Sequence, residues 1–267
     1  MRIVTLIENL VYQNGLVAEH GLSIYIETEN CKILFDTGQS GLFLQNAFTL
    51  GIKIEEIESL VLSHGHYDHT GGLYSFLEKN SKAKIYAKNS IFTPKYSGNS
   101  RFIGTPENEE RLNNRMIYVD SITEIAENIF IVTDIPISNS IDTHFNGMYK
   151  KADGNFIPDE FDDELFLLFK HNNKINIITA CSHRGITNIC KTATEHFDLP
   201  IGLILGGLHM KNSTIEQNEH LIQFFRQIQP ESLGVCHCTG IERFAELRKD
   251  LESDVFYNFT GNEVVIK

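Results

Sequence analysis

Four side chains that can bind a metal ion fall within six consecutive residues. They are His64, His66, Asp68 and His69, in the pattern HxHxDH, after an apolar run at 57–62 that predicts a buried strand. Residues two apart in an extended segment point the same way, so His64 and His66 can converge on one ion. Asp68 and His69 lie past a bend, at the expected start of a helix, and can face a second ion. So many imidazoles beside a carboxylate would repel or stay unsatisfied unless a cation held them together.

Three later histidines each follow a predicted strand. His183 comes after residues 175–179, His209 after 201–205 and His237 after 232–235. Strand ends are where α/β folds gather ligands. A single histidine there is more often a hydrogen-bonded surface residue, but three of them beside the first cluster indicate an open metal site. Two ions about 3.5–4 Å apart could clamp a substrate oxygen and lower the pKa of a shared water toward about 7.

The predicted elements that position these side chains alternate between strands and helices. We expect strands at residues 2–7, 22–28, 32–35, 57–62, 83–87, 116–119, 129–132, 165–169, 175–179, 201–205 and 232–235, with two short strands closing the chain. We expect helices at residues 40–50, 73–79, 186–196, 214–229 and 241–251. Both halves of the chain run strands first and helices later, which suits two sheets packed together with helices outside.

The stretch from about residue 88 to residue 164 is less regular. It holds four of the six prolines and many Asn, Ser and aromatic residues. Irregular stretches of this length are usually functional or mobile, so we expect long loops or a lid here. Its side chains that could meet a phosphate or a ring, but are expected on the solvated surface, are Lys95, Tyr96, Arg101, His144 and Tyr149.

Composition narrows the class of protein. The chain has 267 residues and a net charge of −12, which argues against non-specific nucleic-acid binding and against an anionic membrane surface. An anionic substrate stays possible because metal ions can supply local positive charge. The five cysteines form no CxxC pair and no signal peptide is visible, so we expect free thiols in a reducing, cytoplasmic compartment. We expect Cys181, Cys236 and Cys238 to be small buried packing residues.

These motifs resemble the metallo-β-lactamase fold superfamily. The matching residues are Phe35-Asp36-Thr37-Gly38, the run from Leu62 through the HxHxDH motif to Gly72, His183 and His237. More narrowly, the chain resembles the branch of 7,8-dihydropterin-6-methyl-4-(β-D-ribofuranosyl)aminobenzene 5′-phosphate synthases. The marks of that branch are Glu19-His20-Gly21-Leu22-Ser23, Cys181-Ser182-His183, Gly206-Gly207-Leu208-His209 and His237-Cys238-Thr239-Gly240. The resemblance covers nearly the whole chain, and residues 88–164 match least.

The resemblance implies an α/β fold and, in detail, an αββα sandwich with two mixed sheets and helices outside. A single domain would span residues 1–267, with a loop-rich insertion or lid at about 88–164. The site would lie at one edge between the sheets. The implied ligands of the first metal are His64, His66 and His183, and those of the second are Asp68, His69 and His237. Asp36 would orient a ligand histidine, and His20 either reaches the site or lies on the surface.

One departure concerns the second metal. Superfamily members often place a bridging Asp after the strand that here reads Leu203-Ile204-Leu205, whereas this chain has Gly206-Gly207 there and His209 two residues on. The second site could therefore be weaker, be empty or recruit His209. One or two divalent ions are expected. Zinc is the default for a His-rich site, and iron and manganese accept the same ligands.

The leading hypothesis is a metal-dependent hydrolase that uses metal-activated water on a phosphate ester or related small molecule. Asp68 would position the nucleophile or take its proton, and His209 would contact the substrate or protonate the leaving group. The first alternative is the synthase reaction, which joins a dihydropterin methyl group to an aminobenzene ribofuranosyl phosphate with loss of diphosphate, for a methanopterin-type cofactor. The second alternative is a non-enzymatic module that binds a metal and a small ligand.

Overall fold

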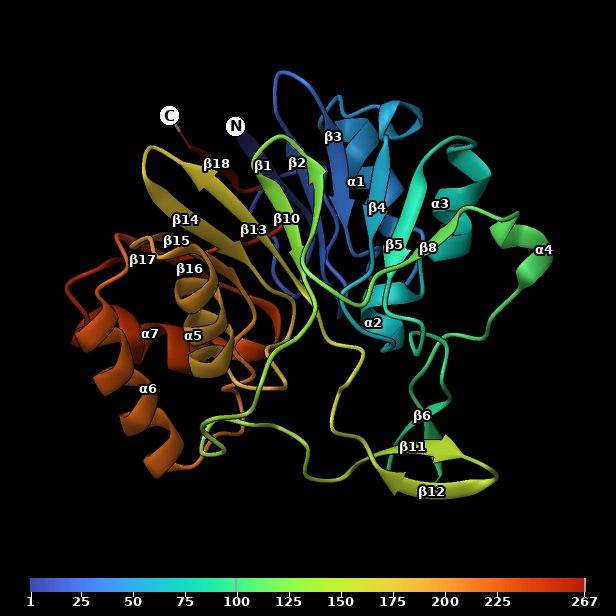
Figure 1. Ribbon diagram of the computed structural model, residues 1–267. Coiled ribbons are helices and arrows are strands. Elements are labelled where there is room, and N and C mark those ends of the chain that lie inside the picture. Colours follow the sequence, from blue (N-terminus) through green and yellow to red (C-terminus); the bar gives the residue numbers. More distant parts are fainter. Residues whose placement is uncertain (99, 267) are drawn as a thin grey trace. The chain divides into compact units, whose positions relative to one another are not determined.

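A computed structural model describes residues 1–98 and 100–266 of the chain (Figure 1). These residues divide into two compact units. Unit 1 comprises Met1–Val119, Asn146–Asp163 and Phe259–Lys267, and unit 2 comprises Asp120–Phe145 and Glu164–Asn258. None of the described helices has the length and apolar character that crossing a bilayer requires.

Unit 1 contains a seven-stranded mixed sheet with the order β18-β1-β2-β3-β4-β5-β8. The strands are β1 (Arg2–Ile7), β2 (Ser23–Glu27), β3 (Lys32–Phe35), β4 (Ser59–Val61), β5 (Lys84–Ala87), β8 (Met116–Tyr118) and β18 (Glu263–Val265). Neighbours from β18 to β3 are antiparallel, and neighbours from β3 to β8 are parallel. Parallel strands end at the same edge, so the segments that follow β3 and β4 lie side by side.

Two helices pack on this sheet through an apolar core. They are α1 (Leu42–Thr49) and α3 (Leu73–Lys79). Phe43 and Ala47 lie four residues apart on the buried face of α1. Leu73 and Phe76 lie three residues apart on the buried face of α3. The shorter helices of unit 1 are η1 (Ile54–Glu56), α2 (Tyr67–Thr70) and α4 (Glu109–Leu112).

Unit 2 contains a second seven-stranded mixed sheet, in the order β17-β16-β15-β14-β13-β10-β9. Its strands are β9 (Thr123–Ala126), β10 (Ile129–Val132), β13 (Phe166–His171), β14 (Lys174–Ile178), β15 (Ile201–Gly206), β16 (Ser232–Val235) and β17 (Asp254–Tyr257). The strands from β14 to β17 are parallel, and the strands from β9 to β14 are antiparallel.

The helices of unit 2 are α5 (Ile186–Phe197), α6 (Ile215–Ile228) and α7 (Ile241–Asp250), with the short helix η2 (His237–Thr239). Their apolar residues share one core with the sheet, to which α6 contributes Leu221 and Phe225. A capping box begins α6. Thr214 accepts a hydrogen bond from the Gln217 backbone, and the Gln217 side chain accepts one from the Thr214 backbone, which satisfies two otherwise unpaired amides.

A third, four-stranded sheet belongs to unit 1 and has the order β12-β11-β6-β7. Its strands are β6 (Lys95–Ser97), β7 (Arg101–Phe102), β11 (Met148–Ala152) and β12 (Asn155–Pro158). All four fall where the sequence predicted loops, and that prediction was wrong for these residues. Asp153 and Gly154 join β11 to β12 with φ angles of 48° and 81°, as a two-residue hairpin turn requires.

The predicted mixed α/β class is confirmed. Five predicted elements have the observed bounds, namely β1, β3, β10, β16 and α3, and the bounds of the other predicted helices and strands differ by no more than two residues. Besides the small sheet, the described elements that sequence reasoning did not name are the short segments α4, β9, η1 and η2. Helices and strands with a buried apolar pattern were therefore predictable, and the short, mostly exposed segments were not.

Candidate metal centre

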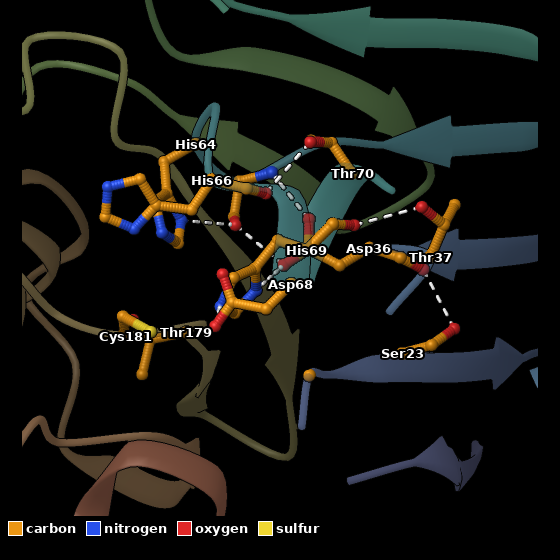
Figure 2. A network of polar contacts seen from close by, with 12 residues as sticks. Ser23, Asp36, Thr37, His64, His66, Asp68, His69, Thr70, Thr179 and Cys181 are labelled. Carbon is orange, nitrogen blue, oxygen red and sulfur yellow. Dashed lines mark hydrogen bonds and ion pairs between the residues drawn. The ribbon is translucent and has the colours of Figure 1, made fainter. Parts of the chain in front are cut away.

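The HxHxDH segment follows β4 in unit 1 and includes the one-turn helix α2. His64 precedes α2, His66 lies at its N-cap, and Asp68 and His69 lie within it. Figure 2 shows these four side chains gathered beside Asp36. The turn to helical backbone after His66 is what allows all four side chains to face one region, as the spacing predicted.

Backbone hydrogen bonds fasten this segment to three neighbours in unit 1. The Tyr67 amide donates to the Ile103 carbonyl at 2.8 Å, and the Thr37 amide donates to the His69 carbonyl at 2.7 Å. The Leu22 amide donates to the Asp68 carbonyl at 3.1 Å. A segment held by its own backbone presents its side chains with little remaining freedom, which lowers the entropic cost of binding a ligand.

Asp36, directly after β3, fixes the tautomers of two histidines. Its Oδ2 lies 2.7 Å from His69 Nδ1 and accepts a hydrogen bond from Ser63 Oγ at 2.6 Å. Ser63 has one hydroxyl hydrogen, which goes to Asp36, so its oxygen accepts from His64 Nδ1 at 2.9 Å. Both imidazoles therefore carry their proton on Nδ1 and present the lone pair of Nε2. This is the form in which histidine ligates a metal.

The remaining distances in unit 1 suit a divalent cation. The ring centroid of His64 lies 4.7 Å from that of His66 and 4.3 Å from that of His69. Asp68 Oδ2 lies 3.8 Å from His69 Nε2 and 3.2 Å from His20 Nε2. Two ligands of a tetrahedral ion with bonds of about 2.1 Å lie about 3.4 Å apart. The spacing of His69 and Asp68 thus fits a shared ion, and His20 reaches the carboxylate.

A buried ionic group at the four-stranded sheet supports the loop that carries His64 and His66. Lys95 Nζ lies 2.6 Å from Asp159 Oδ2 and 2.9 Å from Asp163 Oδ1, and the three side chains are at most 1% exposed. The other oxygen of Asp163 accepts the Gly65 amide at 2.7 Å. The expectation of a solvated Lys95 was wrong, because the lysine neutralises two buried carboxylates, one of which holds the loop between the first two histidines.

Phe161 lies between this ionic group and the imidazoles. Its ring centroid is 5.1 Å from that of His66 and 6.0 Å from that of His64, and the Lys95 ammonium is 5.1 Å from it. The Asp159 carboxylate accepts the Phe161 amide at 2.9 Å. Edge contacts of this kind restrict the rotamers of the histidines.

The environment keeps His64 neutral. Burial lowers the pKa of His64 well below its usual range, and the neighbouring His69 and His66 lower it further, against a weaker opposing effect of Asp68. A neutral imidazole has the lone pair that a metal requires, whereas a protonated one would repel the cation.

In unit 2, the three later histidines follow adjacent parallel strands. His183 comes after β14, His209 after β15, and His237 after β16 in η2. Both oxygens of buried Glu164 hold the loop after β14, since they accept the His183 amide and the Arg184 amide at 2.7 Å each. The strand ends that the sequence indicated are therefore neighbours in the folded chain.

His144, His183 and His209 form a group of adjacent imidazole rings that are tilted against one another. The His209 ring centroid lies 4.4 Å from that of His183 and 4.8 Å from that of His144. His183 Nδ1 lies 3.2 Å from the His144 carbonyl. The His144 amide in turn donates a hydrogen bond to the His183 carbonyl at 2.8 Å. Burial, together with His209, lowers the pKa of His144 to about 4. Sequence reasoning expected His144 on the surface and gave no signal of this contact.

Sulfur atoms lie beside the same histidines. The His209 amide donates to Cys238 Sγ at 3.3 Å, and that sulfur lies 3.7 Å from the Cys181 carbonyl. Burial opposes ionisation of the Cys238 thiol, but the interactions with Cys181 and His209 and the nearby His237 outweigh it, so its pKa lies well below the usual value. All five cysteines of the chain are free thiols.

Several residues of these loops have left-handed backbone, which side chains other than glycine rarely adopt. Asp36 has a φ of 59°, Phe161 of 52°, Ser182 of 55°, His209 of 51° and His237 of 52°. Each such residue costs on the order of 1 kcal/mol or more and persists only where its surroundings impose it. Part of the backbone strain among the described residues therefore lies at the candidate ligands and at their neighbours.

The predicted site residues thus fall into two groups. Unit 1 brings together His20, Asp36, His64, His66, Asp68 and His69, and unit 2 brings together His183, His209 and His237. The joint ligation of metals by the two groups stays a prediction. Sequence reasoning missed the residues that support them, which are Lys95, His144, Asp159, Asp163 and Glu164. A buried lysine or acid in a loop-rich stretch leaves no periodic signal, so spacing alone could not have found them.

Comparison with known proteins agrees with this fold. The family described as the metallo-beta-lactamase superfamily matches residues 16–144. The crystal structure of Tm1679, a metal-dependent hydrolase of the beta-lactamase superfamily, superposes with a TM-score of 0.89 and 31% identity, over 100% of this chain and 99% of that one. The chain therefore belongs to the metallo-β-lactamase superfamily and has its mixed α/β fold. Proteins of this fold usually bind divalent metals.

Two curated relatives come from Methanocaldococcus jannaschii. The uncharacterized protein MJ0448 is 31% identical over 247 residues, which cover 91% of this chain and 92% of the relative. The 7,8-dihydropterin-6-methyl-4-(beta-D-ribofuranosyl)-aminobenzene-5′-phosphate synthase is 27% identical over 274 aligned positions, which cover 94% of this chain and 93% of the relative. The predicted resemblance to this branch is confirmed at that level of identity.

Proposed function

We propose that this protein is a metal-dependent hydrolase of a small phosphate ester or related compound. The observation that carries the proposal is the orientation of His64 and His69, whose Nδ1 atoms are engaged by Ser63 and Asp36 so that both present Nε2 as a ligand. The 31% identity with a metal-dependent hydrolase over nearly its full length supports the same class.

We propose that six side chains hold one or two divalent ions, with zinc as the default. The proposed ligands are His64, His66, Asp68, His69, His183 and His237. A bound ion would supply a Lewis acid that activates water and offsets the negative charge of a phosphate. The chain has a net charge of −12, so the proposed metals would be the main local attraction for an anionic substrate.

The side chains have distinct tasks in this proposal. Asp68 orients the nucleophile and accepts its proton at Oδ2, where His20 Nε2 lies 3.2 Å away and can stabilise the carboxylate. His209 donates a proton to the leaving group, and its backbone is fixed by the hydrogen bond of its amide to Cys238. Asp36 holds His69 in the orientation that ligation needs. The free state of all five cysteines supports a reducing, cytoplasmic location.

The test combines elemental analysis with an activity screen. Protein purified without chelator should contain about one or two equivalents of a divalent metal, and it should hydrolyse at least one member of a panel of phosphate mono- and diesters. His66→Ala should lower both metal content and turnover. The control is His196→Ala, because His196 is an exposed histidine at the end of α5. Unchanged metal content and turnover in His66→Ala would refute the proposal.

A second candidate is the synthase activity of the relative that is 27% identical over 94% of this chain. In that case the same ligands would serve the departure of a diphosphate instead of the attack of water. Incubation with a dihydropterin methyl diphosphate and the aminobenzene ribofuranosyl phosphate separates the two functions. A coupled product detected by mass spectrometry supports the synthase, and its absence together with phosphoester turnover supports the hydrolase.

A further inference from the structure

Unit 2 places two cysteine sulfur atoms, which the proposed ligand set does not include, beside histidines that it does include. The ligand atoms of Cys181, His237 and Cys238 all lie within 4.8 Å of one another. Those of Cys181, His183 and His209 do so as well, which makes Cys181 common to both groups. These residues come from the loops after three adjacent parallel strands, so the cluster is assembled by the topology of the sheet.

The spacing of these atoms suits tetrahedral coordination. Bonds of about 2.3 Å to sulfur and about 2.0 Å to nitrogen place neighbouring ligands about 3.5–3.8 Å apart around zinc. That separation lies within the 4.8 Å that bounds the distances among Cys181, His237 and Cys238. The three ligand atoms are therefore close enough to share one ion.

The position of Cys238 coincides with the departure noted in the sequence. At the end of β15 the chain has Gly206-Gly207, where an acidic side chain was expected. A Cβ atom at Gly207 would lie 2.5 Å from Cys238 Sγ and 2.5 Å from the Ala180 carbonyl. The thiol therefore fills the space that a side chain at residue 207 would need. With glycine at 207 and cysteine at 238, the chain lacks the carboxylate that was expected after β15 and has a thiol in its place.

Two hydrogen bonds join the loop after β15 to the loop after β16. The His209 amide donates to Cys238 Sγ at 3.3 Å, and the Leu208 amide donates to Thr239 Oγ1 at 2.9 Å. These contacts hold the Cys238 sulfur beside His209 and near His237. The placement differs from that of Cys190, which is buried in the apolar core of unit 2.

We propose that Cys181 and Cys238 are thiolate ligands of the metal centre, with Cys238 taking the place of the missing carboxylate beside His237. This inference rests on the proposed metal-dependent function and specifies the chemistry of its second metal. A site with two sulfur ligands selects zinc or ferrous iron over manganese and magnesium, which prefer oxygen. The proposal departs from the expectation that both cysteines are packing residues.

The first measurement uses the unaltered full-length protein. X-ray absorption at the zinc edge of the zinc-loaded protein should show sulfur scatterers at about 2.3 Å beside nitrogen or oxygen at about 2.0–2.1 Å. Cobalt replacement should give a thiolate-to-cobalt charge-transfer band in the near ultraviolet, in addition to the ligand-field bands in the visible region. Neither readout depends on catalytic activity.

Variants then assign the sulfur atoms. Cys181→Ser and Cys238→Ser should each weaken the charge-transfer band per bound cobalt, and the double variant should abolish it while the visible bands persist. Cys190→Ala is the matched control and should leave the band unchanged. Bound zinc without any sulfur scatterer, or a full band in the double variant, overturns the thiolate assignment alone. A protein that binds neither zinc nor cobalt overturns the proposed metal-dependent function as well.

Discussion

Replacement of Lys95 by methionine tests the ionic group that braces the HxHxDH loop. Methionine fills most of the space of the lysine chain but removes the ammonium that lies 2.6 Å from Asp159 and 2.9 Å from Asp163. Two carboxylates at most 1% exposed would then lack their counter-charge. Removal of one partner from a buried ion pair costs about 3–5 kcal/mol, so we expect Lys95→Met to lower the free energy of unfolding by that amount.

The sign of the pH effect follows from the pKa directions. Burial alone would lower the pKa of Lys95, but Asp163 and Asp159 outweigh it and raise the pKa. A raised pKa means that the lysine contributes stability that is fully present below its ordinary range and lost as the pH rises through the folded value. Burial raises the pKa of Asp163, and the neighbouring Asp159 raises it further, although Lys95 opposes the shift. The wild-type advantage over Lys95→Met should therefore shrink at strongly alkaline pH, where the lysine loses its charge, and also at acidic pH, where the stranded carboxylates of the variant become protonated.

Chemical denaturation of the full-length protein, followed by circular dichroism, gives the magnitude. The control is Lys150→Met, which breaks the ion pair of Lys150 with Asp162, whose side chain is 54% exposed, and should cost about 1 kcal/mol or less. A variant that combines Lys95→Met with Asp159→Asn and Asp163→Asn removes the stranded charges and should recover part of the loss. Equal, small losses in Lys95→Met and Lys150→Met would refute the reasoning.

Two further predictions concern local features of unit 1. Gly65→Ala should destabilise the protein by about 1–3 kcal/mol in the same denaturation assay, because its Cβ would clash with the Ile91 carbonyl, and unchanged stability would contradict the close approach. Hydrogen bonds from Lys32 and Lys53 lower the pKa of Glu56 to about 2, so its contribution to stability is present above 4.5 and lost as the pH falls through about 2. Carboxyl titration by NMR should show this midpoint and a higher one in Lys32→Met, whereas a wild-type midpoint near 4.5 would contradict it.

The regular elements could be predicted because their apolar residues repeat with a period. Strand β15 is buried along its whole length and helix α5 has a strong apolar face, so both patterns were visible in the sequence. Strand β12 is exposed at every residue and gives no alternation, although Asp153-Gly154 was a readable turn signal beside it. Propensity and pattern fail where a strand buries neither face.

The candidate ligands could be predicted for a different reason, which is the rarity of the HxHxDH spacing. Their supports could not be, because each comes from a distant part of the chain. Asp163 accepts the amide of Gly65, which lies 98 residues earlier, and Glu164 accepts the amide of His183, 19 residues later. Only the fold brings these groups together, and a single sequence contains no record of such pairs.

The last strand has a consequence for how the chain is made in the cell. Strand β18 pairs with β1, and the amino terminus donates a hydrogen bond to the Ile266 carbonyl at 2.9 Å. Because β1 precedes β18 by more than 250 residues, the edge of β1 that β18 covers stays open during synthesis until residues 263–265 have been made. Its open edge is a surface on which other nascent chains can pair. Removal of β18 should therefore promote aggregation through the uncovered edge of β1.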